Sequence, residues 1–272
     1  MSIESVESLD DPRLADYRHV PDPERLRRGD VFVAEGHLVV RTLLSQSRLQ
    51  TRSVLLTDNA LRGLADVIEA HSARTPIFVV PEGAIESLTG FNIHRGCLAL
   101  GARPERTTVA RMLERLVTAD RLVILEQVGN ADNVGGIFRN AAAFGADAVV
   151  IGPACCDPLY RKAIRVSMGA ALRVPFCQAD DWIEDLEAVR AAGFTIVALI
   201  PSPDAEDIGR YASRLAPGAR IALLSGSEGA GLSAAAMAHS DVALRIPMAP
   251  ATDSLNVATA TGIALHRFFP RR

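Results

Sequence analysis

The feature that most constrains the fold is a regular alternation of apolar strand-like runs and helix-like segments from Arg121 to the C-terminus. Strands that alternate with helices in this way form a mostly parallel sheet covered by helices on both faces. Ligands of such sheets bind beyond the carboxyl ends of the strands, so the loops there are where function is expected. The strand-like runs lie at residues 121–128, 146–152, 194–200, 220–225 and 242–247.

A smaller α/β domain is expected to precede this sheet. Residues 53–57 and 76–81 are short apolar runs typical of buried strands, and a helix-like segment separates them. The run at 97–104 is the expected last strand, whereas 1–29 is interrupted by prolines and is expected to be a poorly patterned lead-in. We therefore predict an N-terminal domain over 1–104, a connecting helix over 105–120, and the parallel-sheet domain over 121–272.

Composition sets broad limits on location and partners. The 272-residue chain is 49% apolar, which allows a substantial core. Its uncharged stretches are too short to span a bilayer, and its first residues lack the apolar segment of a signal peptide, so a cytosolic location is expected. The net charge of −3 gives no global attraction to nucleic acid, although a local basic patch could still bind phosphates. The four cysteines have neither a CxxC spacing nor a nearby histidine pair, so no metal site is expected.

The first informative loop lies within residues 129–147 and leads into a helix-like segment. Asp132 or Asn133 is expected to cap that helix, and Gly145 is well placed just beyond its end. Arg139 lies off the apolar stripe of the helix, in its early turns. The plain alternatives are a capping role for Asn133 and a solvated surface position for Arg139.

The second loop is the glycine-rich sequence SGSEGAGLS at residues 225–233. Its glycines allow a close approach of the backbone to a ligand. Glu228 would repel a phosphate, and no lysine follows as it would in a P-loop. A carboxylate at this place suits a ligand with hydroxyl or amino donors, and the alternative is an ordinary turn.

The third loop, residues 246–262, precedes the last helix-like segment. Ser254 or Asp253 is expected to cap this helix, which would leave Asn256 without a capping role. Apolar residues of the loop could line a slot wide enough for a purine ring, although ordinary core packing would also explain them. These residues are Ile246, Met248, Leu255 and Val257.

Taken together, the three loops resemble the SpoU (TrmH) family of RNA ribose 2′-O-methyltransferases, within the SPOUT class. The resemblance covers the family's three motifs in order, and it spans about residues 121–268. Residues 25–102 are similar, less specifically, to the family's substrate-binding domain. The motif sequences are NADNVGGIFRNAAAFG, LLSGSEGAGLS and IPMAPATDSLNVATATGIALH.

The resemblance implies an S-adenosylmethionine-dependent enzyme that acts on structured RNA, either rRNA or tRNA. It also implies a deep trefoil knot in the C-terminal α/β domain and a homodimer with active sites near the subunit interface. The family's cofactor contacts correspond to Gly226, Ile246 and Leu255, with Met248 and Val257 nearby. Its polar active-site positions correspond to Asn133, Arg139, Glu228, Ser254 and Asn256.

The implied reaction is in-line transfer of the sulfonium methyl group to a ribose 2′-oxygen. Arg139 could clamp the adjacent phosphate and stabilise the negative charge that develops on that oxygen. Because an ordinary arginine stays protonated, its role as general base is left open, and no metal is required.

Arg161 and Arg165, four residues apart on one helical face, suit RNA phosphates, although a solvated face is the alternative. A knotted protein that binds RNA or cofactor without catalysis is the competing class.

Overall fold

The computed structural model describes residues 3–20, 24, 28, 30–90, 93, 96–250 and 252–269. The chain divides into two compact units. The first comprises Met1–Pro104 together with Pro158–Arg173, and the second comprises Glu105–Asp157 together with Val174–Arg272. None of the helices in the described ranges combines the length and the apolar character that a membrane crossing requires.

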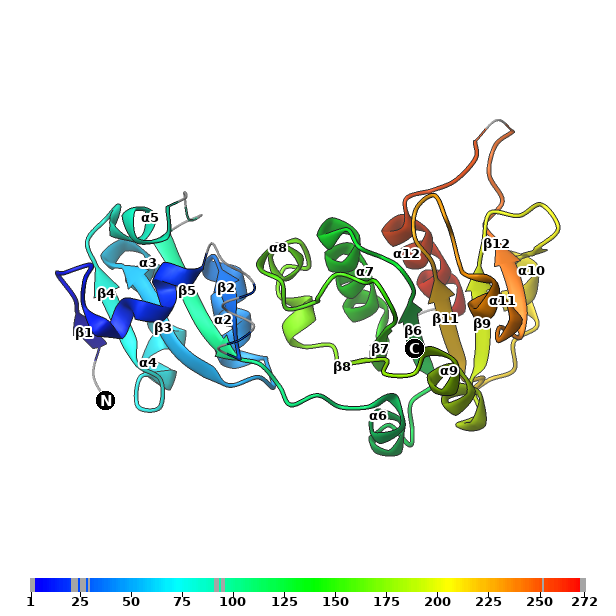
Figure 1. The fold of residues 1–272 in the computed structure, drawn as a ribbon, viewed down its shortest axis with the longest axis horizontal. Coiled ribbons are helices and arrows are strands. Elements are labelled where there is room, and N and C mark those ends of the chain that lie inside the picture. Colours follow the sequence, from blue (N-terminus) through cyan, green and yellow to red (C-terminus); the bar gives the residue numbers. More distant parts are fainter. Residues whose placement is uncertain are drawn as a thin grey trace. The chain divides into compact units, whose positions relative to one another are not determined.

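The first unit is built on a five-stranded sheet with the order β1-β4-β3-β5-β2 (Figure 1). Strands β1, β4 and β3 run parallel, and β5 runs antiparallel to both β3 and β2. The apolar run of β3 is buried on both faces, as predicted for its sequence. The strands are β1 (Ile3–Ser5), β2 (Val31–Glu35), β3 (Thr51–Thr57), β4 (Ile77–Val80) and β5 (Cys97–Ala102).

Short helices cover this sheet. The 3₁₀ helix η1 and helix α5 pack into one core cluster, to which Leu14, Tyr17 and Ile85 contribute. Helix α2 begins after Gly36 and packs against α4. The helices are η1 (Pro12–His19), α2 (His37–Ser45), α3 (Asp58–Gly63), α4 (Ala65–His71) and α5 (Ala84–Thr89).

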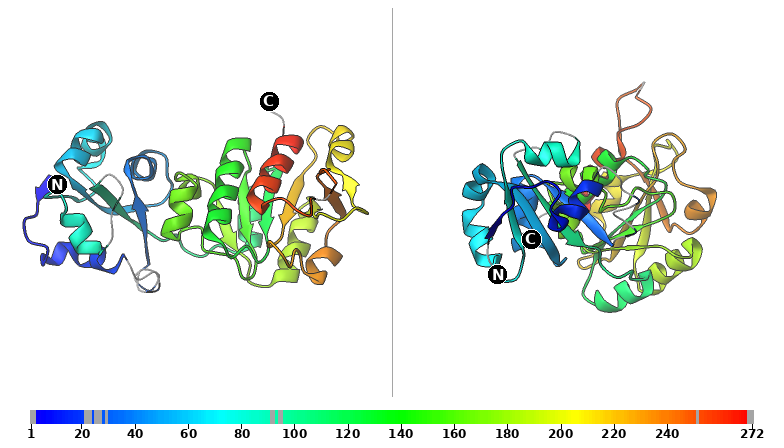
Figure 2. Two further views of the ribbon diagram at one scale, coloured as in Figure 1. Left: turned by 90° about the horizontal axis from the view of Figure 1, so that it is seen from above. Right: turned by 60° about the vertical axis from the view of Figure 1, so that its left-hand side comes forward.

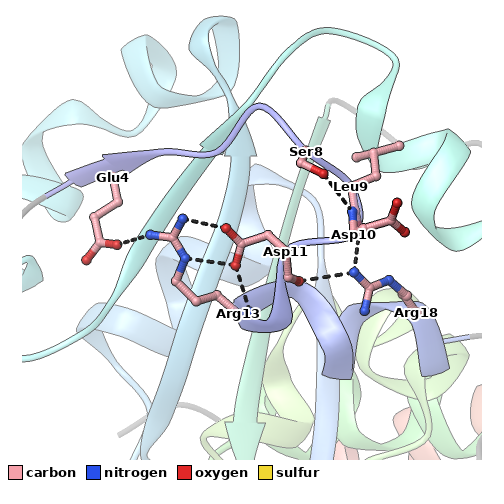
Figure 3. Close-up of polar contacts among 7 residues, drawn as sticks. All are labelled: Glu4, Ser8, Leu9, Asp10, Asp11, Arg13 and Arg18. Carbon is pink, nitrogen blue, oxygen red and sulfur yellow. Dashed lines mark hydrogen bonds and ion pairs between the residues drawn. The ribbon is translucent and has the colours of Figure 1, made fainter.

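The expectation that the N-terminal residues form a poorly patterned lead-in is wrong for residues 3–20. Strand β1 pairs with β4, and Tyr17 is fully buried, with its hydroxyl 2.7 Å from Ser53 Oγ. Arg13 donates to both Asp11 and Glu4, which ties the start of η1 to β1 (Figure 3). These hydrogen bonds lower the pKa of Asp11 to about 2. Most of the remaining lead-in, residues 21–23, 25–27 and 29, lies outside the described residues.

The second unit is built on a seven-stranded, all-parallel sheet with the order β10-β12-β9-β11-β6-β7-β8. The prediction of a parallel α/β sheet is therefore confirmed, and two short strands, β8 and β10, were not expected. The strands are β6 (Arg121–Leu125), β7 (Ala148–Ile151), β8 (Phe176–Gln178), β9 (Thr195–Leu199), β10 (Glu206–Asp207), β11 (Ile221–Ser225) and β12 (Val242–Arg245).

Helices cover both faces of this sheet (Figures 1 and 2). Helices α7, α10 and α12 pack together on one face, and α6, α9 and α11 pack together on the other. Alternate residues of the strands supply the two cores, so that Leu122 and Ile124 of β6 face the layer of α6 and α9. The helices are α6 (Val109–Arg115), α7 (Ala131–Phe144), α9 (Trp182–Ala191), α10 (Ile208–Ser213), α11 (Ala234–Ala238) and α12 (Val257–Phe268).

The two units differ from the expected domain boundaries in two places. Helix α6, expected to form part of a connection, packs against α9 within the second unit. Residues 158–173, which hold α8 (Arg161–Val166) and η3 (Ala170–Leu172), group with the first unit instead of the second. The reason is a set of side-chain contacts: α8 packs on β2, and Ser47 Oγ donates to the Leu172 carbonyl at 2.9 Å.

Candidate functional site

A pocket opens at the carboxyl ends of three adjacent strands of the second unit, β9, β11 and β12. Its volume of about 330 Å³ suits a ligand of nucleoside size. All five residues expected to bind a cofactor line it, as do Glu228 and Ser254. The lining comprises Leu199, Ile200, Pro201, Ser225, Gly226, Ser227, Glu228, Gly229, Gly231, Leu232, Ile246, Met248, Asp253, Ser254, Leu255, Val257 and Ala260.

The glycine-rich loop forms one wall of this pocket because it folds back on itself. Ser227 and Gly231 exchange backbone hydrogen bonds of 3.2 Å in both directions. Gly226 lies against this turn so closely that a Cβ atom there would come within 2.6 Å of the Gly231 carbonyl. Gly229 and Gly231 adopt positive φ angles of 96° and 72°, which other residues rarely accept. The glycines are therefore needed for the shape of the wall.

Asn256, at the end of the third loop, forms hydrogen bonds with the glycine-rich loop and with helix α7. Its Nδ2 donates to Asn133 Oδ1 at 2.8 Å and to Glu228 Oε1 at 2.7 Å. Its Oδ1 accepts from the Thr259 amide, so Asn256 is the N-cap of α12. The expectation that Ser254 or Asp253 caps this helix is wrong, and the capping residue is one of the expected active-site residues. One asparagine thus starts the helix and holds the polar cluster Asn133–Asn256–Glu228 together.

Helix α7 brings Asn133 to this cluster. The helix begins at Ala131 with Asn130 as its N-cap, so the expected caps Asp132 and Asn133 are wrong. Asn133 lies in the first helical turn and is buried, and its side-chain Oδ1 accepts a hydrogen bond from Asn256. Gly145 ends the helix in the left-handed conformation, as predicted. The alternative of a plain capping role for Asn133 is excluded by its position inside the helix.

Close packing between α7 and α12 positions these residues. Asn140 Nδ2 donates to the Ala258 carbonyl at 2.7 Å, and a Cβ atom at Gly136 would meet Ala258 at 2.9 Å. A small residue at 136 is therefore required for the two helices to approach. This contact keeps the start of α7, which carries Asn133, next to the start of α12, which carries Asn256.

Arg139 does not line the pocket, and unlike Asn133 and Asn256 it has no hydrogen bond to the polar cluster in the described residues. Its side chain is exposed on α7, and it forms no ion pair within the described ranges. Ser254 does line the pocket and is exposed there. Among the described residues, Asn133, Asn256 and Glu228 are therefore joined by hydrogen bonds, whereas the exposed side chain of Arg139 is accessible to an external partner.

Arg161 and Arg165 belong to the first unit, whereas the residues that line the pocket belong to the second. Both pair with Glu35, whose side chain is 1% exposed: Arg161 Nη1 lies 2.7 Å from Glu35 Oε2, and Arg165 Nη1 lies 3.7 Å from Oε1. The expected basic face beside the site is thus partly used to neutralise a buried carboxylate. Arg165, whose side chain is 51% exposed, remains the more accessible of the two.

Sequence reasoning missed the wall that β9 provides. Leu199 ends this strand, Ile200 and Pro201 follow it, and all three line the pocket. Strand β9 lies between β11 and β12 in the sheet, so its carboxyl end must lie between the two informative loops. The strand order would have revealed this wall, but the local pattern of 194–200 could not.

The charges of the lining suit a cationic ligand with an apolar ring. Glu228 and Asp253 are the charged residues that line the pocket, and both are acidic. Side chains such as Ile246, Met248 and Leu255 supply apolar surface. S-adenosylmethionine combines an adenosine with a positively charged sulfonium and an amino group, so the residues present fit this molecule.

Burial lowers the reactivity of two of the described cysteine thiols. Among the described residues, no group of three or more His, Cys, Asp or Glu side chains is placed to hold a metal ion. Burial raises the pKa of Cys155 to about 11 and that of Cys177 to about 12. Both thiols therefore stay protonated near neutral pH and are poor nucleophiles.

Fold and site together define an α/β protein with a nucleoside-sized pocket at the carboxyl edge of a parallel sheet, beside a held cluster of polar side chains. The model of the SpoU rRNA Methylase family matches residues 120–266. The chain belongs to this family, and it is an RNA methyltransferase.

Curated relatives agree with this assignment, and a solved structure shares the fold. A Mycobacterium tuberculosis protein described as an uncharacterized tRNA/rRNA methyltransferase is 40% identical over 270 residues, 98% of this chain and 91% of that protein. The 23S rRNA (guanosine(2553)-2′-O)-methyltransferase RlmP of Bacillus subtilis is 26% identical over 97% of this chain and 98% of its own. An AdoMet-bound rRNA methyltransferase from Sinorhizobium meliloti shares the fold, with a TM-score of 0.80, 24% identity and coverage of 98% and 97% of the two chains.

Proposed function

We propose that this protein transfers a methyl group from S-adenosylmethionine to a ribose 2′-hydroxyl of rRNA or tRNA. One observation carries the proposal: the five residues expected to bind the cofactor line a single nucleoside-sized pocket. The polar cluster Asn133–Asn256–Glu228 lies at the edge of that pocket and supplies hydrogen-bonding groups for a ribose. The Bacillus subtilis relative named as a 2′-O-methyltransferase supports the choice of the acceptor atom.

In this proposal the pocket holds S-adenosylmethionine, which supplies an electrophilic methyl group on a good leaving group. Gly226, Ile246 and Leu255 contact the cofactor, and Met248 and Val257 complete the apolar wall. Glu228 and Asp253 favour its positive charge. The protein's main task is then to orient the reactants, which is a large part of catalysis in a transfer of this kind.

Arg139, Asn133, Ser254 and Asn256 orient the RNA. The exposed guanidinium of Arg139 binds the phosphate next to the acceptor ribose and stabilises the charge that develops on the 2′-oxygen. Its lack of an ion pair within the described residues supports this role, because no internal carboxylate competes for it. Asn133 and Asn256 hold their amides at fixed positions through their mutual hydrogen bond, and Ser254 adds a hydroxyl at the pocket edge.

The finer architecture also belongs to the proposal. Strand β11 is inserted between β6 and β9, and α12 returns to pack against α7, which supports a knotted path for the C-terminal segment. We propose a homodimer with the sites near its interface. We further propose that residues 1–104 bind RNA and that residues 121–272 carry methyl transfer. Arg161 and Arg165 contribute to RNA binding, and a cytoplasmic location follows from the RNA substrates.

The test is methylation of RNA isolated from a strain that lacks this gene. The wild-type protein should transfer labelled methyl groups from S-adenosylmethionine, and the product should resist alkaline cleavage at one nucleotide. Arg139→Ala should lower kcat/KM by at least about a hundredfold, the effect of losing one group that stabilises transition-state charge. Arg111→Ala, an exposed helical arginine in α6 on the opposite face of the sheet, is the matched control and should retain wild-type activity.

Two outcomes would contradict the proposal. Full activity of Arg139→Ala would remove the role of this arginine. Binding of S-adenosylmethionine with no methyl transfer to tRNA or rRNA would favour the competing class, a protein that binds cofactor or RNA without catalysis.

A further inference from the structure

One buried residue, Glu126, forms hydrogen bonds with both ends of the glycine-rich loop. Glu126 follows β6 directly and is 1% exposed. Its backbone amide donates to the Ser225 carbonyl at 3.0 Å, where the loop begins. Its carboxylate accepts from the Ser233 amide at 2.8 Å and from the Ser233 hydroxyl at 2.7 Å, where the loop ends. One residue therefore fixes the separation of the loop's two ends.

The carboxylate is chemically matched to this task. A buried carboxylate is costly unless its oxygens accept hydrogen bonds. Ser233 presents two donors side by side, and only a carboxylate offers two acceptor oxygens with no donor of its own. Within the described residues Glu126 has no arginine or lysine partner. The two hydrogen bonds from Ser233 therefore offset the cost of burying its carboxylate. Ser233 in turn accepts from the Ala236 amide as the N-cap of α11.

The loop needs this anchor because glycine gives it little stiffness of its own. Between Ser225 and Ser233 the loop is supported by the hydrogen bonds between Ser227 and Gly231 and by those that Glu228 accepts from Asn256 Nδ2 and the Val257 amide. Glycine residues lose more conformational entropy on ordering than other residues. An end released from Glu126 would let the segment sample other conformations, and cofactor binding would then have to reorder it.

We propose that Glu126 is a positioning residue for the cofactor: it holds the glycine-rich loop in the shape that lines the S-adenosylmethionine pocket. The inference rests on the proposed function, since it names what the held loop is for. Glu126 does not line the pocket, and so it acts through Ser233 and the loop. Its loss should weaken the binding of S-adenosylmethionine much more than it slows methyl transfer at saturation.

The experiment is to measure the Kd of S-adenosylmethionine by calorimetry, and KM and kcat in the RNA methylation assay, for the full-length protein and its variants. Glu126→Gln is nearly isosteric but must turn an NH₂ group toward one of the two Ser233 donors. We expect its Kd and its KM for S-adenosylmethionine to rise about tenfold, with kcat changed by less than about threefold. Ser233→Ala should behave in the same way, and Ser233→Thr, which keeps the hydroxyl, should bind nearly as the wild type does.

Glu35→Gln is the matched control, because Glu35 also carries a buried carboxylate and lies in the first unit. It should leave the Kd of S-adenosylmethionine unchanged even if it lowers stability. A wild-type Kd in Glu126→Gln or Ser233→Ala would overturn the inference, as would an equal loss in Ser233→Thr. If Glu126→Gln does not fold, the two Ser233 variants decide the question. Failure of the wild-type protein to bind S-adenosylmethionine would instead overturn the proposed function.

Discussion

Arg161 is predicted to matter first for stability, because it neutralises the buried carboxylate of Glu35. The side chain of Glu35 is 1% exposed, and Arg161 Nη1 lies 2.7 Å from its Oε2. Arg165 reaches the other oxygen only at 3.7 Å and is 51% exposed. The two arginines have the same chemistry on one short helix and differ in how closely they hold one buried charge. Replacing each by alanine separates these roles.

The expected magnitudes follow from this geometry. Removing one partner of a buried ion pair costs about 3–5 kcal/mol when the other charge is left uncompensated. Arg161 is 29% exposed and Arg165 remains nearby, so we expect Arg161→Ala to lower the free energy of unfolding of the first unit by about 2 kcal/mol. Arg165→Ala should cost no more than about 0.5 kcal/mol, because a pair that is half exposed is screened by water.

Hydrogen exchange measured by mass spectrometry suits this test, since it reports on the first unit alone. Amides of β2 and β5 should exchange about thirtyfold faster in Arg161→Ala, the factor that corresponds to about 2 kcal/mol. In a Glu35→Gln background the same substitution should have a much smaller effect, because no buried charge is then left behind. An equal effect in both backgrounds, or an equal effect of the two arginine substitutions, would refute the reasoning.

Three further predictions concern the site and the N-terminal segment. Gly226→Ala should raise the Kd of S-adenosylmethionine at least tenfold in calorimetry, because its Cβ would lie 2.6 Å from the Gly231 carbonyl; wild-type binding would refute this. Asn256→Ala should lose methylation and about 1 kcal/mol of stability in thermal melts. Asn256→Ser should recover the stability, through its capping oxygen, but not the methylation. Because hydrogen bonds from Arg13 lower the pKa of Asp11 from 3.8 to about 2, their stabilisation is complete above pH 4 and is lost as the pH falls through 2. Acid unfolding curves of wild type and Asp11→Asn should therefore differ above pH 4 and converge near pH 2.

The sequence was sufficient for those parts of the fold that depend on local patterns. The apolar runs of β6, β9 and β11 alternate with helix-like segments, a pattern that favours the interior of a covered parallel sheet, and all three strands are buried there. Gly145 marks the end of α7 because a left-handed residue is needed there. The glycine-rich and Asp-Ser-Leu-Asn loops stood out because no packing requirement explains their composition.

Helix starts were predicted less well, because each start offered several residues able to cap it. Asn130, Asp132 and Asn133 all have suitable side chains, and a shift of one turn decides whether Asn133 caps the helix or lies inside it. The same ambiguity affected Ser254 and Asn256. The cap of α12, Asn256, also donates to Asn133, which lies 123 positions away in the sequence, and no local pattern reveals that contact.

Long-range pairing also explains the features that no local pattern could reveal. Segment 158–173 groups with the first unit because Arg161 meets a carboxylate 126 positions away. Glu126 lies four residues before the nearest motif. Its role as the anchor of the glycine-rich loop depends on its contact with Ser233, 107 positions later in the sequence. Burial of a carboxylate in the loop after a strand is the signal that would have pointed to it, and burial of that kind is not visible in sequence.

These distant pairs imply that the pocket and the second unit form together. Glu126 can reach Ser233 only when β11 lies beside β6, and Asn256 can reach Asn133 only when α12 lies on α7. These conditions require β11 and α12 to be in place, so a partly folded sheet that lacks them has neither the loop anchor nor the polar cluster. A binding site built in this way is present only in the native arrangement, and a ligand that binds it therefore stabilises the whole unit and not one loop.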